Sequence, residues 1–199
     1  MKLLKFSVIF LFIAACATIP HQDRQEKLLL EHLQSWQGFQ ADGIVSVNYE
    51  NFVFRKSINI KKTASDLKIT VYDAGIFGLN PQPFLTVKID SLIQIQAQSG
   101  EPEYFAFDSL AGLEILMEPL LLLPFKEQII KQKNLRFDQN TVIHFSRQMK
   151  IDSIEQISQQ FSIDFSYRTE LAGISIRQAN RELVKIEIDK FIHLPNRNE

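Results

Sequence analysis

The sequence contains a single cysteine, Cys16, and therefore no partner with which it could form a disulfide inside the chain. A fold without disulfides depends on packing for its stability, even in an oxidising compartment. The sequence also lacks an excess of basic residues, because 22 Lys and Arg stand against 23 Asp and Glu. Nucleic-acid binding usually needs such an excess or a clustered basic face, so the composition argues against a nucleic-acid partner.

The motifs of common enzyme classes are missing as well. The histidines are far apart in the chain, and neither HExxH nor CxxC spacing occurs. There is no GxSxG nucleophile elbow and no glycine-rich loop followed by a helix that would hold a phosphate. We therefore expect no bound metal, no cofactor and no catalysed reaction. A lipid-modifying hydrolase, the remaining catalytic interpretation, would need an active site assembled from distant residues.

The apolar run near the N-terminus is too short to span a membrane, since a transmembrane helix needs about 20 apolar residues. Lys2 and Lys5 precede an apolar stretch at residues 6–12, and the small residues Ala14 and Ala15 follow it. A basic start, a short apolar segment and a small-residue cleavage point are the anatomy of a secretory signal. The sequence therefore predicts a signal peptide over residues 1–15.

The stretch Ile13-Ala14-Ala15-Cys16 closely resembles the lipobox of bacterial lipoproteins. The resemblance implies cleavage between Ala15 and Cys16 and attachment of lipid to the Cys16 sulfur. Several acyl chains on one cysteine would anchor the protein stably. Ala17 is not the Asp that retains lipoproteins at the inner membrane of enteric bacteria, so the resemblance points to the outer membrane. The alternatives are an uncleaved anchor, or a secreted protein that happens to begin near a cysteine.

The chain after Cys16 begins with a tether, residues 16–22, and then an amphipathic helix. Asp23 and Glu26 have the spacing of a capping box. Leu29, Leu33 and Trp36 follow at i, i+4 and i+7, which places them on one face of a helix. The sequence predicts a helix over residues 23–37 whose apolar face packs on another element.

After Gly38 the apolar residues alternate with polar ones. Period-two segments occur at residues 45–49, 52–60, 67–71, 85–89 and 93–97, and turn residues separate them. Similar patterns return at residues 141–145, 161–167, 174–176 and 184–188. Short alternating segments joined by turns are typical of an antiparallel sheet with one buried face. We expect about six strands, an interruption, and then about four or five more.

The interruption is an apolar region at about residues 109–134. Pro119 and Pro124 cannot both lie inside one straight helix. The pattern instead predicts a short helix, a break, and a second helix from about Phe125 to Lys133. No long linker divides the chain. Residues 23–199 are therefore expected to form one α+β domain.

The order of these segments resembles the LolA/LolB family of lipoprotein carriers, particularly the outer-membrane receptor that is itself a lipoprotein. The resemblance rests on the lipobox Cys16, the helix-to-strand segment LQSWQGFQADG at residues 33–43, the loop YDAGIFGLN at residues 72–80, and the Leu/Pro-rich insert. It implies an incomplete antiparallel β-barrel of about eleven strands with an N-terminal helix and a helical lid.

The resemblance also implies a function. The chain would be a periplasm-facing outer-membrane lipoprotein that binds the acyl chains of lipoproteins and helps deliver them to the outer membrane. Its partners would be the membrane, acylated lipoproteins and a soluble periplasmic carrier. In the receptor, the loop after the third strand carries a protruding leucine that is implicated in accepting or inserting cargo. Ile76, Phe77 and Leu79 are the corresponding candidates here.

An acyl-binding protein needs an apolar lining, and the sequence offers candidates on the alternating strands and in the insert. The predicted lining consists of Phe52, Phe54, Ile58, Ile60, Leu67, Ile69, Val71, Leu116, Met117, Leu120 and Phe125. Periodicity does not distinguish a cavity from a closed core, because both place apolar residues on one face. If the core is closed, the alternative function is a lipid-anchored structural or adaptor lipoprotein in envelope assembly.

Overall fold

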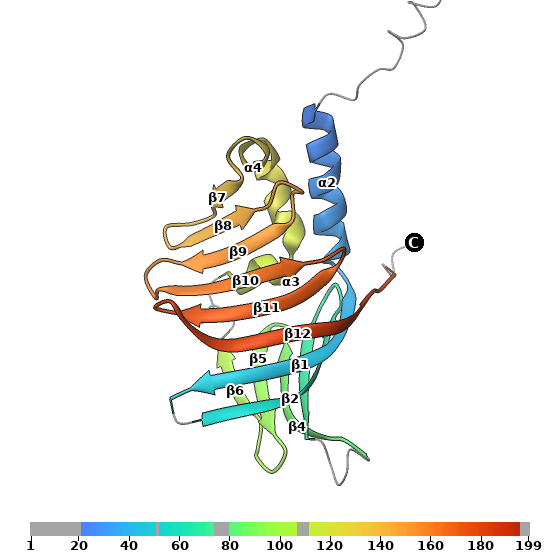
Figure 1. The fold of residues 1–199 in the computed structure, drawn as a ribbon, viewed down its shortest axis with the longest axis vertical. Helices are drawn as coiled ribbons and strands as arrows, with labels where there is room; N and C mark the ends of the chain where they lie inside the picture. The colour runs from blue at the N-terminus through green and yellow to red at the C-terminus, as the bar shows by residue number, and fades with distance from the viewer. Residues whose placement is uncertain (1–20, 51, 74–79, 107–111, 196–199) are drawn as a thin grey trace, which may run out of the picture.

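The fold is taken from a computed structural model of the chain, of which residues 21–50, 52–73, 80–106 and 112–195 are described. It consists of one antiparallel sheet, an N-terminal helix and a short helical insert (Figure 1). The helical elements are α2 (His21–Ser35), α3 (Leu113–Met117), the 3-10 helix η2 (Pro119–Phe125) and α4 (Lys126–Gln132). The strands are β1 (Phe39–Tyr49), β2 (Phe52–Lys62), β3 (Leu67–Asp73), β4 (Gln82–Ile89), β5 (Leu92–Ala97), β6 (Glu103–Ala106), β7 (Asn134–Arg136), β8 (Thr141–Phe145), β9 (Ile151–Gln156), β10 (Phe161–Tyr167), β11 (Leu171–Gln178) and β12 (Arg181–His193).

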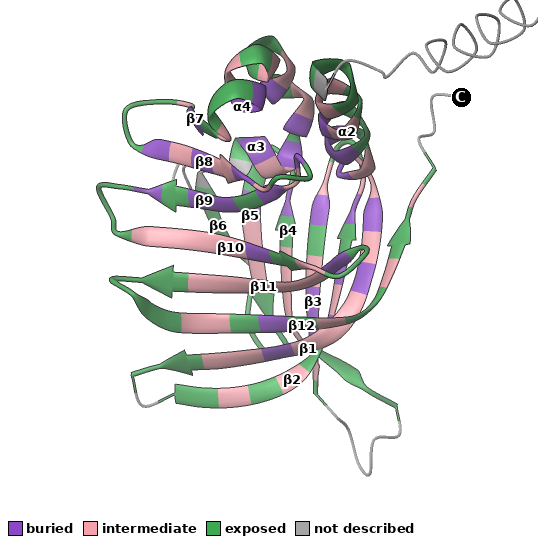
Figure 2. Ribbon diagram, turned by 45° about the horizontal axis from the view of Figure 1, so that its top comes forward, coloured by how far each residue is buried: buried purple, intermediate pink, exposed green. Residues whose placement is uncertain are grey.

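The sheet is a continuous ladder whose ends do not meet. Its strand order is β6-β5-β4-β3-β2-β1-β12-β11-β10-β9-β8-β7, and β6 and β7 are the edge strands. The sheet curls, so that β3 to β6 lie behind the strands β9 to β12 in Figure 2. The predicted fold class is therefore confirmed: an α+β protein with an open, barrel-like antiparallel sheet, an N-terminal helix and a helical insert.

The strand count differs from the expectation, because the described residues contain twelve strands rather than about eleven. The second half of the sheet has six strands, and the sequence pattern indicated four or five. Strand β9 has the burial order buried, exposed, buried, buried, exposed, buried, with Ser153 and Gln156 among its buried residues. A strand that buries polar side chains lacks the apolar alternation by which strands are recognised.

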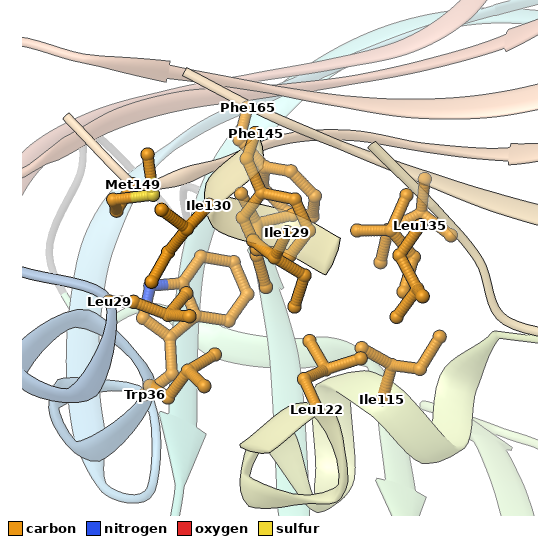
Figure 3. Close-up of a cluster of buried hydrophobic side chains, with 14 of the residues drawn as sticks. Leu29, Trp36, Ile115, Leu122, Ile129, Ile130, Leu135, Phe145, Met149 and Phe165 are labelled. Carbon is orange, nitrogen blue, oxygen red and sulfur yellow. The ribbon is translucent and has the colours of Figure 1, made fainter. Parts of the chain in front are cut away.

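Helix α2 begins at His21 and ends at Ser35, slightly earlier than the expected 23–37. Its predicted stripe is confirmed, because Leu29, Leu33 and Trp36 are 1%, 0% and 4% exposed. These side chains contact the insert and strands β7 to β11 in a first apolar cluster, which contains Ile115, Leu122, Ile129, Leu135, Ile143 and Phe165 (Figure 3). The helix therefore stabilises one half of the curved sheet.

The insert has the expected interruption. α3 ends before Glu118, and the 3-10 helix η2 then contains both prolines, Pro119 and Pro124. A 3-10 helix is a common form of short connector, and proline removes a hydrogen-bond donor that a long α-helix would need. Lys126 of α4 pairs with Glu26 of α2, and Lys133 Nζ donates to Gln25 Oε1 at 3.0 Å. The insert is thus fastened to the N-terminal helix.

A second apolar cluster lies in the other half of the sheet. Its buried members come mainly from β1 to β5, together with Ile186 of β12 and Met117 of α3. Leu116 packs against both clusters. The insert therefore lies where the two halves of the curved sheet meet. Figure 2 shows α2, α3 and α4 gathered along one side of the molecule, at the top of the view.

Candidate functional site: the concave face of the sheet

The inward face of β2 becomes progressively buried along the strand. From the β1–β2 turn inward, Phe52 is 55% exposed, Phe54 is half-buried, and Ile58 and Ile60 are each 4% exposed. The same gradient occurs on β1, where Tyr49 is 49% exposed and Val45 only 4%. One end of the concave face is therefore open to solvent, and the other end is packed.

Half-buried apolar side chains extend from the open end of β2 to the neighbouring strands of the sheet. Antiparallel pairing places directly opposite residues on the same face, and the register pairs Val47 with both Phe54 and Val184, and Val87 with Ile95. We call this region the concave apolar surface. It consists of Val47, Phe54, Ile69, Phe84, Leu85, Val87, Ile95, Ile174, Val184 and Ile188, all half-buried and packed against the second cluster.

The eleven residues predicted to line a cavity do not all come together. Eight of them belong to or pack against the second cluster: Phe54, Ile58, Ile60, Leu67, Ile69, Val71, Leu116 and Met117. Of these, Ile58, Ile60, Leu67, Val71 and Met117 are buried, with exposures of 4–8%. Leu120 packs against the first cluster, and Phe125 lies beside Phe137 with ring centroids 6.4 Å apart. Phe52 lies at the exposed end, beside Phe54. A role in ligand binding stays a prediction for each of them.

Sequence reasoning missed several residues of the concave apolar surface. Phe84, Leu85, Val87, Ile95 and Val184 all lie there, yet none was among the predicted lining. Four of them have the period-two signal that identified β2. Phe84 does not, because a register shift between Val71 and Tyr72 disturbs the pairing of β3 with β4. Its position follows only from the structure.

Two lysines lie on this apolar face. Lys62 is 2% exposed, and its Nζ donates to Gln37 O at 3.3 Å and to Thr63 O at 3.2 Å. Burial lowers the pKa of Lys62 to about 8, against the opposing effects of the Asp66 and Glu118 charges. A buried ammonium without an adjacent carboxylate is costly, so these two carbonyls are needed to stabilise its charge.

Lys56 lies nearer the open end of the same strand. Its Nζ is 2.8 Å from Asp73 Oδ1 and 4.7 Å from the ring centroid of Phe84. Phe84 and Phe54 are in edge contact at 6.1 Å, and Phe54 and Phe52 at 5.2 Å. The open end of the concave face therefore combines aromatic rings with one ion pair.

A separate hollow lies between α2 and the ends of β10 to β12. It has a volume of about 420 Å³, and Trp36, Tyr167 and Phe191 contribute aromatic walls. Here His32 Nε2 accepts a hydrogen bond from Ile151 N at 2.9 Å, so in the neutral ring the proton lies on Nδ1. Burial, and secondarily the Lys150 charge, lower the pKa of His32 to about 3. None of the predicted lining residues borders this hollow.

Some predicted sites lie outside the described residues. These are the lipidation and cleavage residues Ala15 and Cys16, and the loop residues Ile76, Phe77 and Leu79. Within the described parts of the chain, no group of three His, Cys, Asp or Glu side chains is placed to hold a metal ion. No helix among those residues is long and apolar enough to span a membrane.

No protein-family model matches the sequence, and no curated protein matches it significantly. Among solved structures, the chain is similar to a LolA superfamily protein from Nitrosomonas europaea, with 8% identity, 86% of this chain and 95% of that chain covered, and a TM-score of 0.46. It is also similar to a domain assigned as an outer-membrane lipoprotein-sorting protein from Vibrio parahaemolyticus, with 7% identity, 87% and 93% coverage, and a TM-score of 0.47.

Proposed function

We propose that this chain is a lipid-anchored receptor that holds acyl chains of lipoproteins on its concave apolar surface and delivers them to the outer membrane. The observation that carries the proposal is the exposure gradient from Phe52 to Ile60, which leaves apolar side chains open to solvent inside a curved sheet. An apolar surface that faces solvent commonly marks a binding site.

The energetics of acyl binding suit such a surface. Each methylene of an acyl chain gains about 0.8 kcal/mol when it leaves water. Side chains that are only half-buried lose little packing when a ligand arrives and bury further area at about 25 cal/mol per Å². A partly covered surface also lets the chain leave again, as delivery requires. In this proposal, no covalent step takes place on the ligand.

The anchor completes the proposed arrangement. Lipid on Cys16 holds the domain at the periplasmic face of the outer membrane, and residues 16–20 connect the lipid to α2. The loop with Ile76, Phe77 and Leu79 contacts incoming cargo or the membrane. Acylated lipoproteins are the cargo, and a soluble periplasmic carrier supplies them. These assignments come from the sequence resemblance and from the signal-like N-terminus.

An adaptor lipoprotein is the second candidate. It is favoured by the burial of Ile58, Ile60, Leu67, Val71 and Met117, which form a closed core at the inner end of the same face. In this alternative, the sheet docks protein partners and holds no acyl ligand.

Displacement of a fluorescent fatty-acyl probe tests the proposal. The chain from Ala17 to Glu199 is suitable, because every described helix and strand lies within it. We expect saturable binding that a diacylated peptide displaces. Phe54→Ser should weaken binding at least about fivefold, since burying a Phe side chain is worth roughly 1.5–3 kcal/mol.

Val53→Ser is the matched control. Val53 precedes Phe54 on β2, lies on the opposite face and is 73% exposed. Its replacement should leave probe affinity unchanged. Absence of binding to the wild type at saturating probe would favour the adaptor. Equal losses in both variants would show that the probe does not occupy the concave apolar surface.

A further inference from the structure

The ion pair between Lys56 and Asp73 lies on the concave side of the sheet, and apolar residues adjoin its lysine. Lys56 pairs in register with Val45, which is buried in the second cluster, and its neighbours on the same face of β2 are Phe54 and Ile58. Surface ion pairs normally lie among polar groups. This one interrupts the apolar face on which the ligand is proposed to lie.

The geometry leaves part of the Lys56 ammonium available. The side chain of Lys56 is 20% exposed and that of Asp73 is 53% exposed. An ammonium has three N–H groups. One of them donates to Asp73 Oδ1, 2.8 Å from Nζ, and the centroid of the Phe84 ring lies 4.7 Å from Nζ. Since no second acceptor contacts this ammonium among the described residues, an N–H remains for an acceptor on a ligand.

The surrounding charge favours an uncharged acceptor. Asp73 already neutralises Lys56, so a ligand carboxylate would gain one attraction and meet one repulsion at similar range. The other cation of this face, Lys62, is buried and held by backbone carbonyls. An ester or amide carbonyl accepts a hydrogen bond without carrying a charge and avoids the repulsion by Asp73.

We infer that the Lys56–Asp73 pair binds the polar end of the acyl ligand and selects acyl chains linked through uncharged ester or amide groups over free fatty acids. This inference rests on the proposed function and specifies its ligand. The acyl chain lies along the concave apolar surface, and a carbonyl at its head accepts from Lys56 Nζ. Asp73 excludes the free carboxylate, and the aromatic rings of Phe54 and Phe84 flank the head.

Competition with two probes of equal chain length tests the inference. Monolauroylglycerol has an uncharged ester head, and laurate has a carboxylate; both are used below micellar concentration at pH 7.5 with the chain from Ala17 to Glu199. The wild type should bind the ester more tightly. Asp73→Asn should raise laurate affinity about threefold to fivefold, as expected for removal of a partly exposed charge, and so narrow the preference for the ester.

Two further variants separate this mechanism from a general charge effect. Lys56→Met should weaken ester binding about threefold to tenfold, the value of one hydrogen bond. Glu187→Gln also removes one negative charge, but Glu187 pairs at 2.8 Å with Lys185 on the opposite, convex side. It should change neither affinity. Thermal melts establish that each variant folds.

The outcomes distinguish the inference from the proposed function. If neither probe binds the wild type, the proposed function fails and the inference fails with it. If both probes bind but the wild type does not prefer the ester, the inference alone is overturned. It is also overturned if Asp73→Asn shifts the laurate-to-ester ratio no more than Glu187→Gln does.

Discussion

At the scale of single residues, His32 links stability to pH. The pKa of His32 is lowered from 6.5 to about 3, because burial disfavours the charged ring. Between these values the unfolded chain binds the proton and the folded chain does not. The free energy of unfolding should therefore have its full value above pH 6.5. It should fall as the pH drops below 6.5, by at most about 1.4 kcal/mol per pH unit. Urea unfolding at pH 7.0 and pH 5.0 measures this loss.

Two variants show whether His32 causes the loss. His32→Gln places an amide oxygen near the position of Nε2, so Ile151 N keeps an acceptor while the titrating group is gone. The acid-side loss should shrink by up to about 2 kcal/mol. His193→Gln removes a histidine that is 46% exposed and paired with Glu170, and it should retain the wild-type loss. If His32→Gln loses as much stability as the wild type, another group is responsible.

At the scale of elements, Gly43 fixes the contact between β1 and β12. A register shift lies between Asp42 and Gly43, and a Cβ at Gly43 would lie 2.1 Å from Glu187 O. The backbone of β12 at Glu187 cannot move away from this Cβ at small cost. Gly43→Ala should therefore lower the free energy of unfolding by at least about 2 kcal/mol, as measured by urea unfolding. Gly100→Ala is the control, because the nearest atom there, Ala97 Cβ, is 3.7 Å away. Equal effects would show that β12 adjusts without strain.

The helical insert provides a second prediction at this scale. Leu122 is 0% exposed in the first cluster, and its neighbour Leu121 is 42% exposed. Leu122→Ala should lower the free energy of unfolding by about 2–5 kcal/mol, through lost burial and the cavity left behind. Leu121→Ala should cost less than about 1 kcal/mol. Similar losses from both would mean that η2 packs differently from the contacts seen in Figure 3.

At the scale of the whole molecule, attachment to the membrane is predicted to depend on Cys16. Cys16→Ser should abolish labelling by a palmitate analogue and leave an unprocessed precursor of higher mass, because the thiol would be the site of acylation. Gel mobility and labelling in a bacterial host measure both effects. Normal processing together with membrane retention of this variant would exclude the lipoprotein interpretation.

A change at the next residue separates processing from sorting. Ala17→Asp keeps Cys16, so cleavage and labelling should remain normal. In an enteric host, the family resemblance predicts that this variant accumulates at the inner membrane, and sucrose-gradient fractionation measures its distribution. Loss of labelling in Ala17→Asp would show that labelling depends on the residues around the cleavage site and not on the Cys16 thiol alone.

Much of the fold was predictable from local patterns. The i, i+4, i+7 stripe of Leu29, Leu33 and Trp36 predicted α2, and Pro119 and Pro124 predicted the broken insert, because both signals are properties of neighbouring residues. Strand β9 was not predictable in this way. Its buried Gln156 donates from Nε2 to Thr141 Oγ1 at 3.1 Å, a contact that exists only once β8 and β9 pair.

The sequence by itself determined which residues share a face, since alternation along β2 places Phe52, Phe54, Ile58 and Ile60 on one side whatever the surroundings. Only the tertiary structure decided how deep each of them lies. Phe52 and Ile60 follow the same pattern, yet they are 55% and 4% exposed. The sheet's curl, the position of the insert and the pairing of Lys56 with Asp73 all depend on residues far apart in the chain. Their contacts form only when the sheet is complete, so no local pattern encodes them.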